Sequence, residues 1–565
     1  MHLPSTEPRR SIYYKYRVYP AHVPSSPNET DAKRVVIVGG GPVGLTAALD
    51  LARYGVPCVL LESEQQVSEG SRAIVFTRRS MEILQQVGVA DRISERGLPW
   101  RNGNSFYRGE RVFRMEAPHD PDDRFYPMIN LQQQYLEEYL VDAAMANPLI
   151  EVRWGNRVVQ VEQAKDRVYL QVDTPEGPYQ LEADWVVAAD GARSPIRTAM
   201  NLQMEGASYE GRFVIADIRI DLDLPTERLA FFDPVWNPGN TVLMHREPGN
   251  IWRIDYQLPA DETPEEALAP ESLKARINAQ LAMIGVENRE WEMDWCSVYS
   301  ARALTLPDYI HGRVIFTGDA AHMLPIFGVR GANTGWQDCH DLIWKLAFQV
   351  RGWAGDKLLP SYSAERVNAA REIIDEASKS TRFMTPPTHG FRLLRDATLS
   401  LSLKHEFVRP LFHWRTSRPH EYGDSLLNCR GDDNALFRRG PADGAQLANV
   451  HLGEQGFLFD HLGASFYLMY FTEGDAIPAD ILAEVNTVRA RGIPFRIVAI
   501  RRNGSGEMPG ADLVFGDADG RFWAKYGIST GGGAYLVRPD QHVCARWVTL
   551  AADRLNAAIR TALGN

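Results

Sequence analysis

A chain of 565 residues with 44% apolar side chains is long enough to bury several hydrophobic cores, which suggests two to four domains. Its formal charge of -11 argues against nucleic acid or an anionic membrane as a partner, because both favour a basic surface. The five cysteines form no CxxC pair and no apolar run approaches the roughly 18 residues of a membrane span, so we expect a cytoplasmic protein without disulfides or a metal site.

The first 63 residues predict an arm followed by a nucleotide-binding unit. Residues 1–33 show no periodic pattern, and we expect an extended arm packed on the body. Residues 34–63 predict a strand, a glycine turn, a helix and a second strand. Gly39, Gly41 and Gly44 form the GxGxxG pattern of a dinucleotide site, and Glu62 ends the second strand, where a carboxylate accepts hydrogen bonds from ribose hydroxyls. A purely structural glycine turn is the alternative, and the motif does not separate NAD from FAD.

A second motif follows the buried strand predicted at residues 184–190. This strand places Asp190 and Gly191 of DGARSPIR at its carboxyl end, where ligands bind to such sheets. A helix cap is the alternative role for Asp190. Between the two motifs, QQQYLEEYLVDAA predicts a helix with Gln133 near its start. Taken alone, Gln133 is better explained as a solvated helix residue than as a cofactor contact.

The rest of the chain predicts three further regions. Alternating stretches such as FVIADIRIDL and NIWRIDYQL indicate an antiparallel sheet inserted at residues 206–300. The strand in GRVIFTGDAAH then returns to the nucleotide domain, and helical spacing follows from Trp336. We therefore predict the arm at 1–33, a nucleotide domain at 34–205 and 301–435 that includes a helical linker, the inserted sheet domain at 206–300, and a domain of strands and helices at 436–565.

Three motifs stand in the order GxGxxG…E, DGxxSxxR and GDAAHxxxP…GxN. Together they resemble the class A flavoprotein aromatic hydroxylases, single-component FAD monooxygenases with the p-hydroxybenzoate hydroxylase fold. The resemblance implies an α/β fold with a Rossmann-type FAD domain, an inserted antiparallel substrate sheet and a C-terminal domain similar to the thioredoxin-like domain of phenol hydroxylase. Because that last domain lacks CxxC, we expect it to serve packing and homodimer formation, not dithiol chemistry.

The resemblance also implies the contacts of the FAD. Asp319 is expected to bind a ribityl hydroxyl, Asp190 and Gly191 to lie near the pyrophosphate, and Arg72 to contact the flavin or the pyrophosphate. Residues 328–333 are expected to follow the pyrimidine edge of the flavin, where the dipole of the following helix stabilises negative charge. The expected cofactor residues are Gly39, Gly41, Gly44, Glu62, Arg72, Gln133, Asp190, Gly191, Gly318, Asp319, Gly328, Gly331, Ala332 and Asn333.

Three residues are the catalytic candidates. Pro325 matches the proline beside the reactive edge of the flavin, and Arg253 resembles the sheet arginine that approaches the ring, with a solvated strand residue as the alternative. Arg330 is expected to place a cation beside the flavin or to hold an anionic substrate group. The alternative is a salt-bridged surface residue. The family's usual glycine-glycine-glutamine-glycine reads Gly-Val-Arg-Gly at residues 328–331, where the β-branched Val329 is expected to avoid a positive φ angle.

The implied reaction is the hydroxylation of a phenolic ring. NADH or NADPH reduces FAD, the reduced flavin captures O2, and a flavin hydroperoxide transfers hydroxyl to the ring. A flavin-dependent oxidase or halogenase is an alternative, although the chain lacks the WxWxIP signature of the halogenases. A nonenzymatic flavin-binding redox or interaction protein is another. The residues expected to line the substrate pocket are His245, Trp252, Asp255 and Tyr256, although Trp and Tyr at alternating spacing usually belong to a core.

Overall fold

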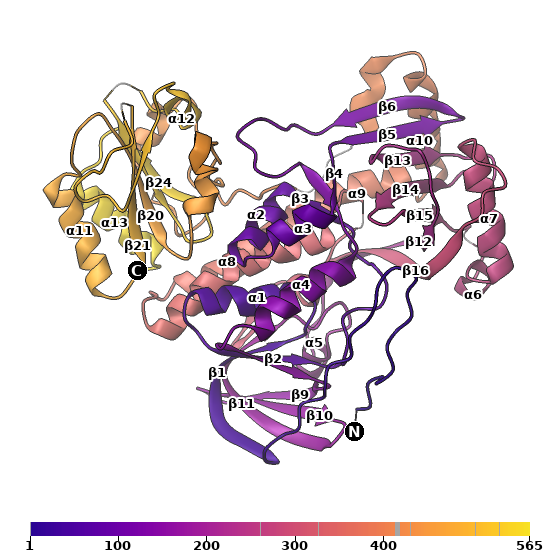
Figure 1. The fold of residues 1–565 in the computed structure, drawn as a ribbon, viewed down its shortest axis with the longest axis horizontal. Coiled ribbons are helices and arrows are strands. Elements are labelled where there is room, and N and C mark those ends of the chain that lie inside the picture. The colour runs from indigo at the N-terminus through magenta and orange to yellow at the C-terminus, as the bar shows by residue number, and fades with distance from the viewer. Residues whose placement is uncertain are drawn as a thin grey trace.

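The computed structural model describes residues 2–259, 261–325, 327–412, 418–429, 431–502, 504–529 and 531–565. Three large β-sheets lie in separate parts of the molecule, and two long helices, α8 (Gly331–Arg351) and α9 (Leu358–Met384), run between them (Figure 1). This is the predicted α/β architecture with an inserted sheet and a C-terminal sheet domain.

Parallel strands form the centre of the first sheet, in which β1 pairs with β11 on one side and with β2 on the other. Val35, Val36 and Ile37 of β1 are completely buried, as an apolar central strand of a parallel sheet should be. The predicted strand-turn-helix-strand unit is confirmed, with α1 (Pro42–Arg53) between β1 and β2. The strands are, in spatial order, β17 (Ile310–His311), β18 (Val314–Phe316), β11 (Gly177–Ala188), β1 (Asn28–Val38), β2 (Cys58–Glu62) and β8 (Ile150–Trp154), with β10 (Val168–Thr174) and β9 (Arg157–Gln163) branching from β11.

The second sheet is mostly antiparallel and wider than the predicted stretch 206–300. β5 and β6 join it from the first part of the chain, and β19 joins it directly after the GDA turn, so this sheet and the nucleotide domain are interlaced. One face of the sheet is apolar and is covered by α7 (Pro270–Met283). The strands are, in order, β19 (His322–Met323), β16 (Glu292–Thr305), β12 (Glu205–Arg219), β15 (Ile251–Gln257), β14 (Thr241–Glu247), β13 (Arg228–Phe232), β5 (Asn102–Tyr107) and β6 (Glu110–Glu116).

The third sheet belongs to the C-terminal domain, but it shares a hydrophobic core with the first. Trp344 and Phe348 on α8 pack against Phe466 on β20 with ring centroids 5.7 and 5.9 Å apart. Residues of the first sheet, α8 and the C-terminal domain therefore form one continuous buried cluster. The strands are, in order, β22 (Leu513–Gly516), β21 (Phe495–Arg501), β20 (Phe466–Thr472), β23 (Gly533–Val537) and β24 (Val543–Trp547), flanked by α11 (Ala479–Ala490), α12 (Arg521–Lys525) and α13 (Ala552–Ala562).

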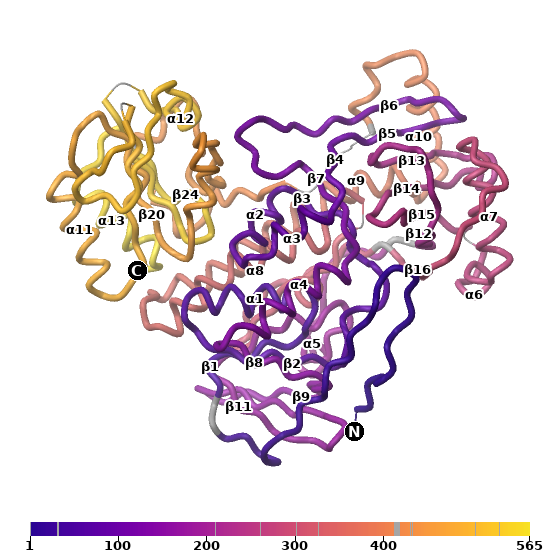
Figure 2. The backbone as a smooth tube through the Cα atoms, in the orientation of Figure 1, coloured from indigo at the N-terminus to yellow at the C-terminus, as the bar shows by residue number. Residues whose placement is uncertain are grey.

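The N-terminal arm is extended, but it is shorter than predicted because β1 begins at Asn28 and pairs there with β11. Figure 2 shows the arm running from the first sheet towards β16 and back. The backbone N–H of Ile12 donates to Asp294 Oδ1 on β16 at 2.6 Å, and Tyr19 stacks on Trp154 of β8 with centroids 4.3 Å apart. The arm therefore joins the first two sheets.

Shorter elements complete the fold. β3, β7 and β4 form a small sheet beside α8, and no helix among the described residues is long and apolar enough to cross a membrane. These elements are β3 (Val75–Thr77), α2 (Arg78–Gln86), α3 (Ala90–Arg96), β4 (Leu98–Trp100), β7 (Met128–Asn130), α4 (Gln133–Met145), α5 (Pro195–Ala199), α6 (Pro264–Ala267), η1 (Gly318–Ala320), α10 (His389–Ser402), η2 (Glu406–Phe412), η3 (Asp432–Leu436), η4 (Gly453–Gln455) and η5 (Leu458–His461).

Candidate active site

The three glycines of the first motif have different surroundings. A Cβ on Gly39, whose φ is +109°, would lie 2.3 Å from the carbonyl oxygen of Ala189, and a Cβ on Gly44 would lie 1.9 Å from the carbonyl oxygen of Gly39. Around Gly41, a Cβ would meet no atom within 4 Å. Gly39 and Gly44 are thus required by the fold itself, whereas Gly41 leaves space in front of the N-terminus of α1, where a pyrophosphate fits.

Glu62 lies at the end of β2, directly beside this turn. Its Oε2 accepts from the backbone N–H of Gly40 at 2.6 Å, and its Oε1 accepts from the backbone N–H of Glu64 at 2.8 Å. Burial raises the pKa of the carboxyl. Oε1 also accepts from Ser63 Oγ at 3.1 Å, whereas Oε2 has one partner. Glu62 is therefore held in position, and Oε2 keeps a lone pair that suits a ribose hydroxyl.

Asp190 lies between β11 and α5, and its two carboxylate oxygens have different surroundings. Its Oδ2 accepts from the backbone N–H of Ile196 at 3.1 Å, which caps the short helix. Its Oδ1 is buried and has no partner among the described atoms, and burial raises the pKa of the carboxyl to about 6. A buried carboxylate oxygen without a partner is costly, so this atom suits a ligand hydroxyl or amide. The adjacent Gly191 is open on the side that a Cβ would occupy.

Asp319 lies in η1 at the carboxyl end of β18, close to the Asp190 turn. Arg197 links the two turns, because its Nη1 donates to the carbonyl oxygen of Ala320 at 3.0 Å and its Nη2 donates to that of Ala192 at 2.6 Å. The Asp319 side chain is exposed, yet desolvation by the surrounding protein raises its pKa, and the charge of Arg72 opposes this shift. Asp319 is therefore open on one side and crowded on the others, with the exposed Arg72 nearby.

The turn at residues 327–330 corrects one sequence expectation. Val329 has φ +60°, the left-handed conformation that a β-branched residue was expected to avoid. The strain is offset by packing, because Val329 contacts the small apolar cluster of Ile74, Val75 and Trp100, and its carbonyl oxygen accepts from Asn333 Nδ2 at 2.9 Å. Val329 thus adopts the left-handed backbone conformation that usually requires a glycine. Pro325, Gly328 and Gly318 are buried in the same region.

Arg330 is buried, with 5% of its surface exposed, so its interpretation as a surface residue was wrong. It precedes the first residue of α8, and its carbonyl oxygen accepts from the backbone N–H of Thr334 at 2.8 Å. Its guanidinium donates to the carbonyl oxygens of Phe327 at 3.3 Å and Ile373 at 3.4 Å. Arg330 therefore places a buried positive charge at the N-terminus of α8.

Two expected cofactor residues use their side chains to hold the protein together. Asn333 Oδ1 accepts from the backbone N–H of Thr77 at 2.9 Å, and Asn333 Nδ2 donates to the carbonyl oxygen of Val75 at 2.9 Å, so its amide joins α8 to β3. Gln133 is buried, which rules out a solvated residue: its Oε1 accepts from the backbone N–H of Ala73, and its Nε2 donates to Glu137. Both side chains fix the loop that carries Arg72. Ala332 packs against the main core and Gly331 is open on its Cβ side.

His322 has a structural role. Its Nε2 lies 2.5 Å from Asp338 Oδ2 on α8, and Asp338 Oδ1 accepts from Arg366 Nε on α9 at 2.6 Å. All three side chains are fully buried. Burial opposes ionisation of Asp338, but the charges of His322 and Arg366 lower its pKa to about 2. The same carboxylate accepts from the backbone N–H of Gly318, so it holds the GDA turn against α8.

Arg253 anchors the second sheet to the loop that carries Arg72. Its Nε and Nη2 donate to the two carboxylate oxygens of Asp217, each at 2.8 Å. The same guanidinium donates to the carbonyl oxygens of Ser71 and Arg72. Because Arg253 is 3% exposed, its interpretation as a solvated strand residue was wrong. Its side chain lies beside the loop of Arg72 and holds that loop against the sheet.

The structure divides the four expected substrate residues between the two faces of the second sheet. Trp252 and Tyr256 belong to the apolar face under α7, so they are core residues and not pocket residues. His245 and Asp255 lie on the opposite face together with Arg253, since His245 is paired with Arg253 across β14 and β15. This second, polar face is the side that contacts the 327–330 turn, where Phe213 packs on Phe327 with centroids 5.4 Å apart.

Sequence reasoning missed several groups of this polar face. Asp217 and Glu247 lie there with His245, Arg253 and Asp255, all buried. The polar positions of β12, β14 and β15 recur at every second residue, and this alternation would have revealed them as a set. Arg228 on β13 is also buried beside Asp255, but it shows no such signal in the sequence.

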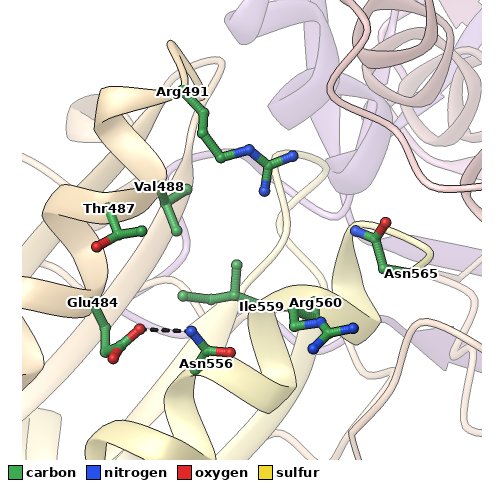
Figure 3. A pocket seen from close by; sticks show the side chains of 8 residues that line it. All are labelled: Glu484, Thr487, Val488, Arg491, Asn556, Ile559, Arg560 and Asn565. Carbon is green, nitrogen blue, oxygen red and sulfur yellow. Dashed lines mark hydrogen bonds between the residues drawn. The ribbon is translucent and has the colours of Figure 1, made fainter.

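A cavity of about 240 Å³ lies elsewhere, between α11 and α13 of the C-terminal domain (Figure 3). Arg491 and Arg560 line it, but so does Glu484, which accepts from Asn556 Nδ2 at 2.6 Å. None of the motif residues lies near it. The strand ends of the first sheet, and not this cavity, carry the groups that a dinucleotide requires.

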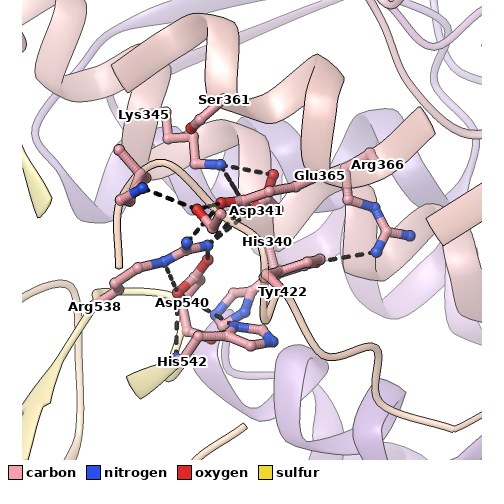
Figure 4. Close-up of polar contacts among 12 residues, drawn as sticks. His340, Asp341, Lys345, Ser361, Glu365, Arg366, Tyr422, Arg538, Asp540 and His542 are labelled. Carbon is pink, nitrogen blue, oxygen red and sulfur yellow. Dashed lines mark hydrogen bonds and ion pairs between the residues drawn. The ribbon is translucent and has the colours of Figure 1, made fainter. Parts of the chain in front are cut away.

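A buried group of charges joins the C-terminal domain to α8 and α9 (Figure 4). Arg538 donates to Glu365 Oε1 at 2.8 Å and to Asp341 Oδ1 at 2.9 Å, and it also pairs with Asp540. Lys345 Nζ lies 2.7 Å from Glu365 Oε2. We call Asp341, Lys345, Glu365, Arg538 and Asp540 the interdomain ion cluster; each side chain is at most 3% exposed.

Comparisons with known proteins agree with this geometry. A family model described as an FAD binding domain matches residues 32–377, more than half of the chain. A "3-(3-hydroxy-phenyl)propionate/3-hydroxycinnamic acid hydroxylase" of Mycobacterium sp. (strain JLS) is 31% identical over 94% of this chain and 92% of its own. Two solved structures, each 25% identical, are similar: the flavin-dependent monooxygenase PieE with FAD and substrate (TM-score 0.78; 94% of this chain, 98% of that one) and aklavinone-11 hydroxylase with FAD and aklavinone (0.76; 95% and 100%).

The site residues fit the cofactor that these comparisons indicate. The open side of Gly41 fits a pyrophosphate, and the partnerless Oδ1 of Asp190 and the exposed Asp319 fit hydrogen-bonding groups of FAD. The family match and the relatives establish that the chain belongs to the FAD-binding class A monooxygenase family and is an FAD-dependent aromatic hydroxylase.

Proposed function

We propose that the aromatic substrate is a phenol with an acidic side chain, bound on the polar face of the second sheet. The main observation behind this proposal is that unpartnered polar atoms and an apolar wall lie next to each other on this face. His245 Nδ1 and Asp255 Oδ1 are buried without a partner among the described atoms, while Phe213, Leu243 and Phe327 supply an apolar wall. An aromatic ring with one hydroxyl matches such a surface.

Two buried arginines are the reason for proposing that the substrate has an acidic side chain. Arg330 lies at the N-terminus of α8, and Arg228 lies on β13 close to Asp255. Burial lowers the pKa of Arg228 to about 10, so it remains charged at neutral pH. The hydroxylases of the two mycobacterial relatives are named for hydroxyphenyl substrates whose side chain ends in a carboxylate, and a guanidinium is a usual partner for a carboxylate.

We further propose how the chain holds FAD. Gly41 would face the pyrophosphate, in a turn that Gly39 and Gly44 make possible. Glu62 would bind the ribose, Asp190 with Gly191 would lie on the phosphate side, and Asp319 would bind a ribityl hydroxyl. Arg72 would lie beside Asp319. The backbone of residues 328–333 would follow the flavin ring, with Pro325 at the reactive edge of the ring. Gln133 and Asn333 would support the surrounding loops. The chemistry that FAD supplies when bound is hydride acceptance from NADH or NADPH and activation of O2, with one oxygen atom entering the ring and the other leaving as water.

The protein's own part in this scheme is electrostatic and steric. The N-terminus of α8 and the buried Arg330 would stabilise negative charge on the flavin, by roughly 1–2 kcal/mol for the helix terminus. The interlaced sheets and the turn at 327–330 would exclude water from the ring. Cytoplasmic location and homodimer formation are parts of the same proposal, as is the limit between residues 435 and 436 that separates the C-terminal domain.

The test is oxidation of NADH and NADPH in air by the FAD-loaded protein, with hydrogen peroxide and hydroxylated product measured together. The panel pairs 3-(3-hydroxyphenyl)propionate with its neutral amide. We expect the acid to accelerate oxidation with little peroxide, and the amide to show a KM about 10- to 100-fold higher, the loss of one charge-assisted hydrogen bond. Equal KM values for acid and amide would contradict the acidic substrate. Peroxide equal to the nicotinamide consumed with every phenol would favour an oxidase.

A further inference from the structure

We propose that Asp255 is the catalytic base that accepts the proton of the substrate hydroxyl, and that His245 positions this hydroxyl. The inference rests on the proposed phenolic substrate and names the residues that meet its hydroxyl group. It assigns a proton acceptor to the polar face of the second sheet, where the sequence alone assigned none.

The sheet register brings the two side chains together. His245 on β14 is directly opposite Arg253 on β15, and Asp255 follows Arg253 by two residues, so His245 and Asp255 are diagonal neighbours on one face. Diagonal neighbours have Cα atoms about 7–8 Å apart, which leaves room for one oxygen atom to contact both side chains. Both Asp255 Oδ1 and His245 Nδ1 are buried and have no partner among the described atoms.

The other carboxylates of this face are unsuited to the role. Asp217 accepts two hydrogen bonds from Arg253, so both of its oxygens are engaged. Glu247 lies opposite Ile251, farther along β14 and away from the apolar wall, and burial and the nearby Asp217 raise its pKa well above the usual range. Its surroundings therefore favour the protonated form, which is a poor proton acceptor. Asp255 remains as the acid that borders the apolar wall, opposite Leu243.

Charged and titratable groups face Asp255 from every neighbouring strand. Arg253 lies on its own strand, Asp217 on β12, Arg228 on β13, His245 and Glu247 on β14, and Tyr299 on β16. Burial raises the pKa of Asp255 to about 7, with repulsion from Asp217 adding to the shift and both arginines opposing it. Burial and the two arginines lower the pKa of His245, so the imidazole is neutral and can share a hydrogen bond with the hydroxyl. A base that titrates near neutral pH is well matched to general-base catalysis.

The proton balance of the step is simple. The O–H bond of the phenol breaks, its proton forms a new O–H bond with the Asp255 carboxylate, and the electron pair stays on the phenolic oxygen. The negative charge moves from Asp255 to the ring, where Arg228 and Arg253 are near enough to stabilise it. No proton leaves the protein, and the electron-rich ring is prepared to receive the hydroxyl group.

The experiment uses the FAD-loaded protein and a nitrophenol, whose absorbance distinguishes the phenol from the phenolate. At a pH above the Asp255 pKa of about 7 and below the pKa of the free nitrophenol, we expect the wild-type protein to bind the phenolate without releasing a proton to an indicator dye. In Asp255→Asn, the midpoint for ionisation of the bound nitrophenol should rise by about one pH unit or more. Glu247→Gln, which changes a buried acid on the same face, is the matched control and should leave this midpoint unchanged.

Kinetics with the hydroxylated substrate separate the two roles. Asp255→Asn should lower kcat about 10²- to 10⁴-fold with little change in KM, and Asp255→Glu should restore part of the rate. His245→Gln should raise KM more than it lowers kcat. The inference is overturned if the nitrophenol bound to Asp255→Asn ionises at the wild-type midpoint. It is also overturned if the wild-type protein binds the nitrophenol in its neutral form, or if it releases one proton for each phenolate bound. The last two results need no variant. Failure of every phenol to give hydroxylated product would refute the proposed function instead, since nitrophenol binding is measured without turnover.

Discussion

Replacing Arg538 by methionine tests whether the C-terminal domain is structurally part of the FAD domain. Arg538 lies on the chain after β23, yet its guanidinium contacts Asp341 on α8 and Glu365 on α9, and α8 begins at the turn proposed to follow the flavin. Burial and repulsion from Glu365 raise the pKa of Asp341, which favours its protonated form. The remaining charges of the interdomain ion cluster, two negative and two positive, then balance.

Arg538→Met leaves this buried cluster with a net charge of one. Breaking a buried ion pair by removing one partner costs about 3–5 kcal/mol, so we expect a large loss of stability and flavin release at lower temperature. Arg17→Met is the matched control, because Arg17 also pairs with two acids, Glu138 and Asp142, but is 46% exposed; this change should cost at most about 1 kcal/mol. Adding Asp540→Asn to Arg538→Met restores the charge balance and should recover part of the loss.

The pH dependence of the effect has a defined sign. Burial opposes ionisation of Glu365 and Asp540, but the charge of Arg538 lowers both pKa values below their usual range. Carboxyl groups with lowered pKa contribute stability above their unfolded pKa, near 4, and lose it as the pH falls. The difference between wild type and Arg538→Met should therefore be largest at neutral pH and shrink below about pH 4. The assay is thermal unfolding followed by flavin fluorescence and by circular dichroism; equal midpoints for wild type and Arg538→Met would refute this reasoning.

The remaining predictions concern the cofactor and the domains. Gly41→Ala should fold but retain less FAD, whereas Gly44→Ala should fail to fold because its Cβ would lie 1.9 Å from a carbonyl oxygen. The flavin absorbance per folded protein separates the two variants. Full FAD occupancy in Gly41→Ala would contradict the proposed position of the pyrophosphate. Asp319→Ala should weaken FAD retention in ultrafiltration, and an unchanged Kd would remove the ribityl assignment. Truncation after Ala435 exposes the Trp344 surface of α8 and should give an aggregating chain, so a folded, flavin-loaded truncate with full hydroxylase activity would show that the shared core is dispensable.

The strands, helices and motifs of the nucleotide domain could be predicted from the sequence because their signals are local. Gly39, Gly41 and Glu62 belong to one strand-turn-helix-strand unit. Its apolar runs and its glycine spacing all lie within 30 consecutive residues. The strand ends at Asp190 and Asp319 were predicted for the same reason. Family membership followed from the order of these motifs.

The tertiary structure decided what depends on contacts between distant segments. Only the sheet register showed that Trp252 and Tyr256 face α7 while His245 and Asp255 face the opposite side, because alternation alone does not say which face is covered. The burial of Arg330, the support roles of Gln133 and Asn333, and the positive φ of Val329 likewise depend on partners elsewhere in the chain. Arg538 is the extreme case: it lies 173 residues from Glu365, and a charge becomes part of a buried cluster only when folding removes the water around it.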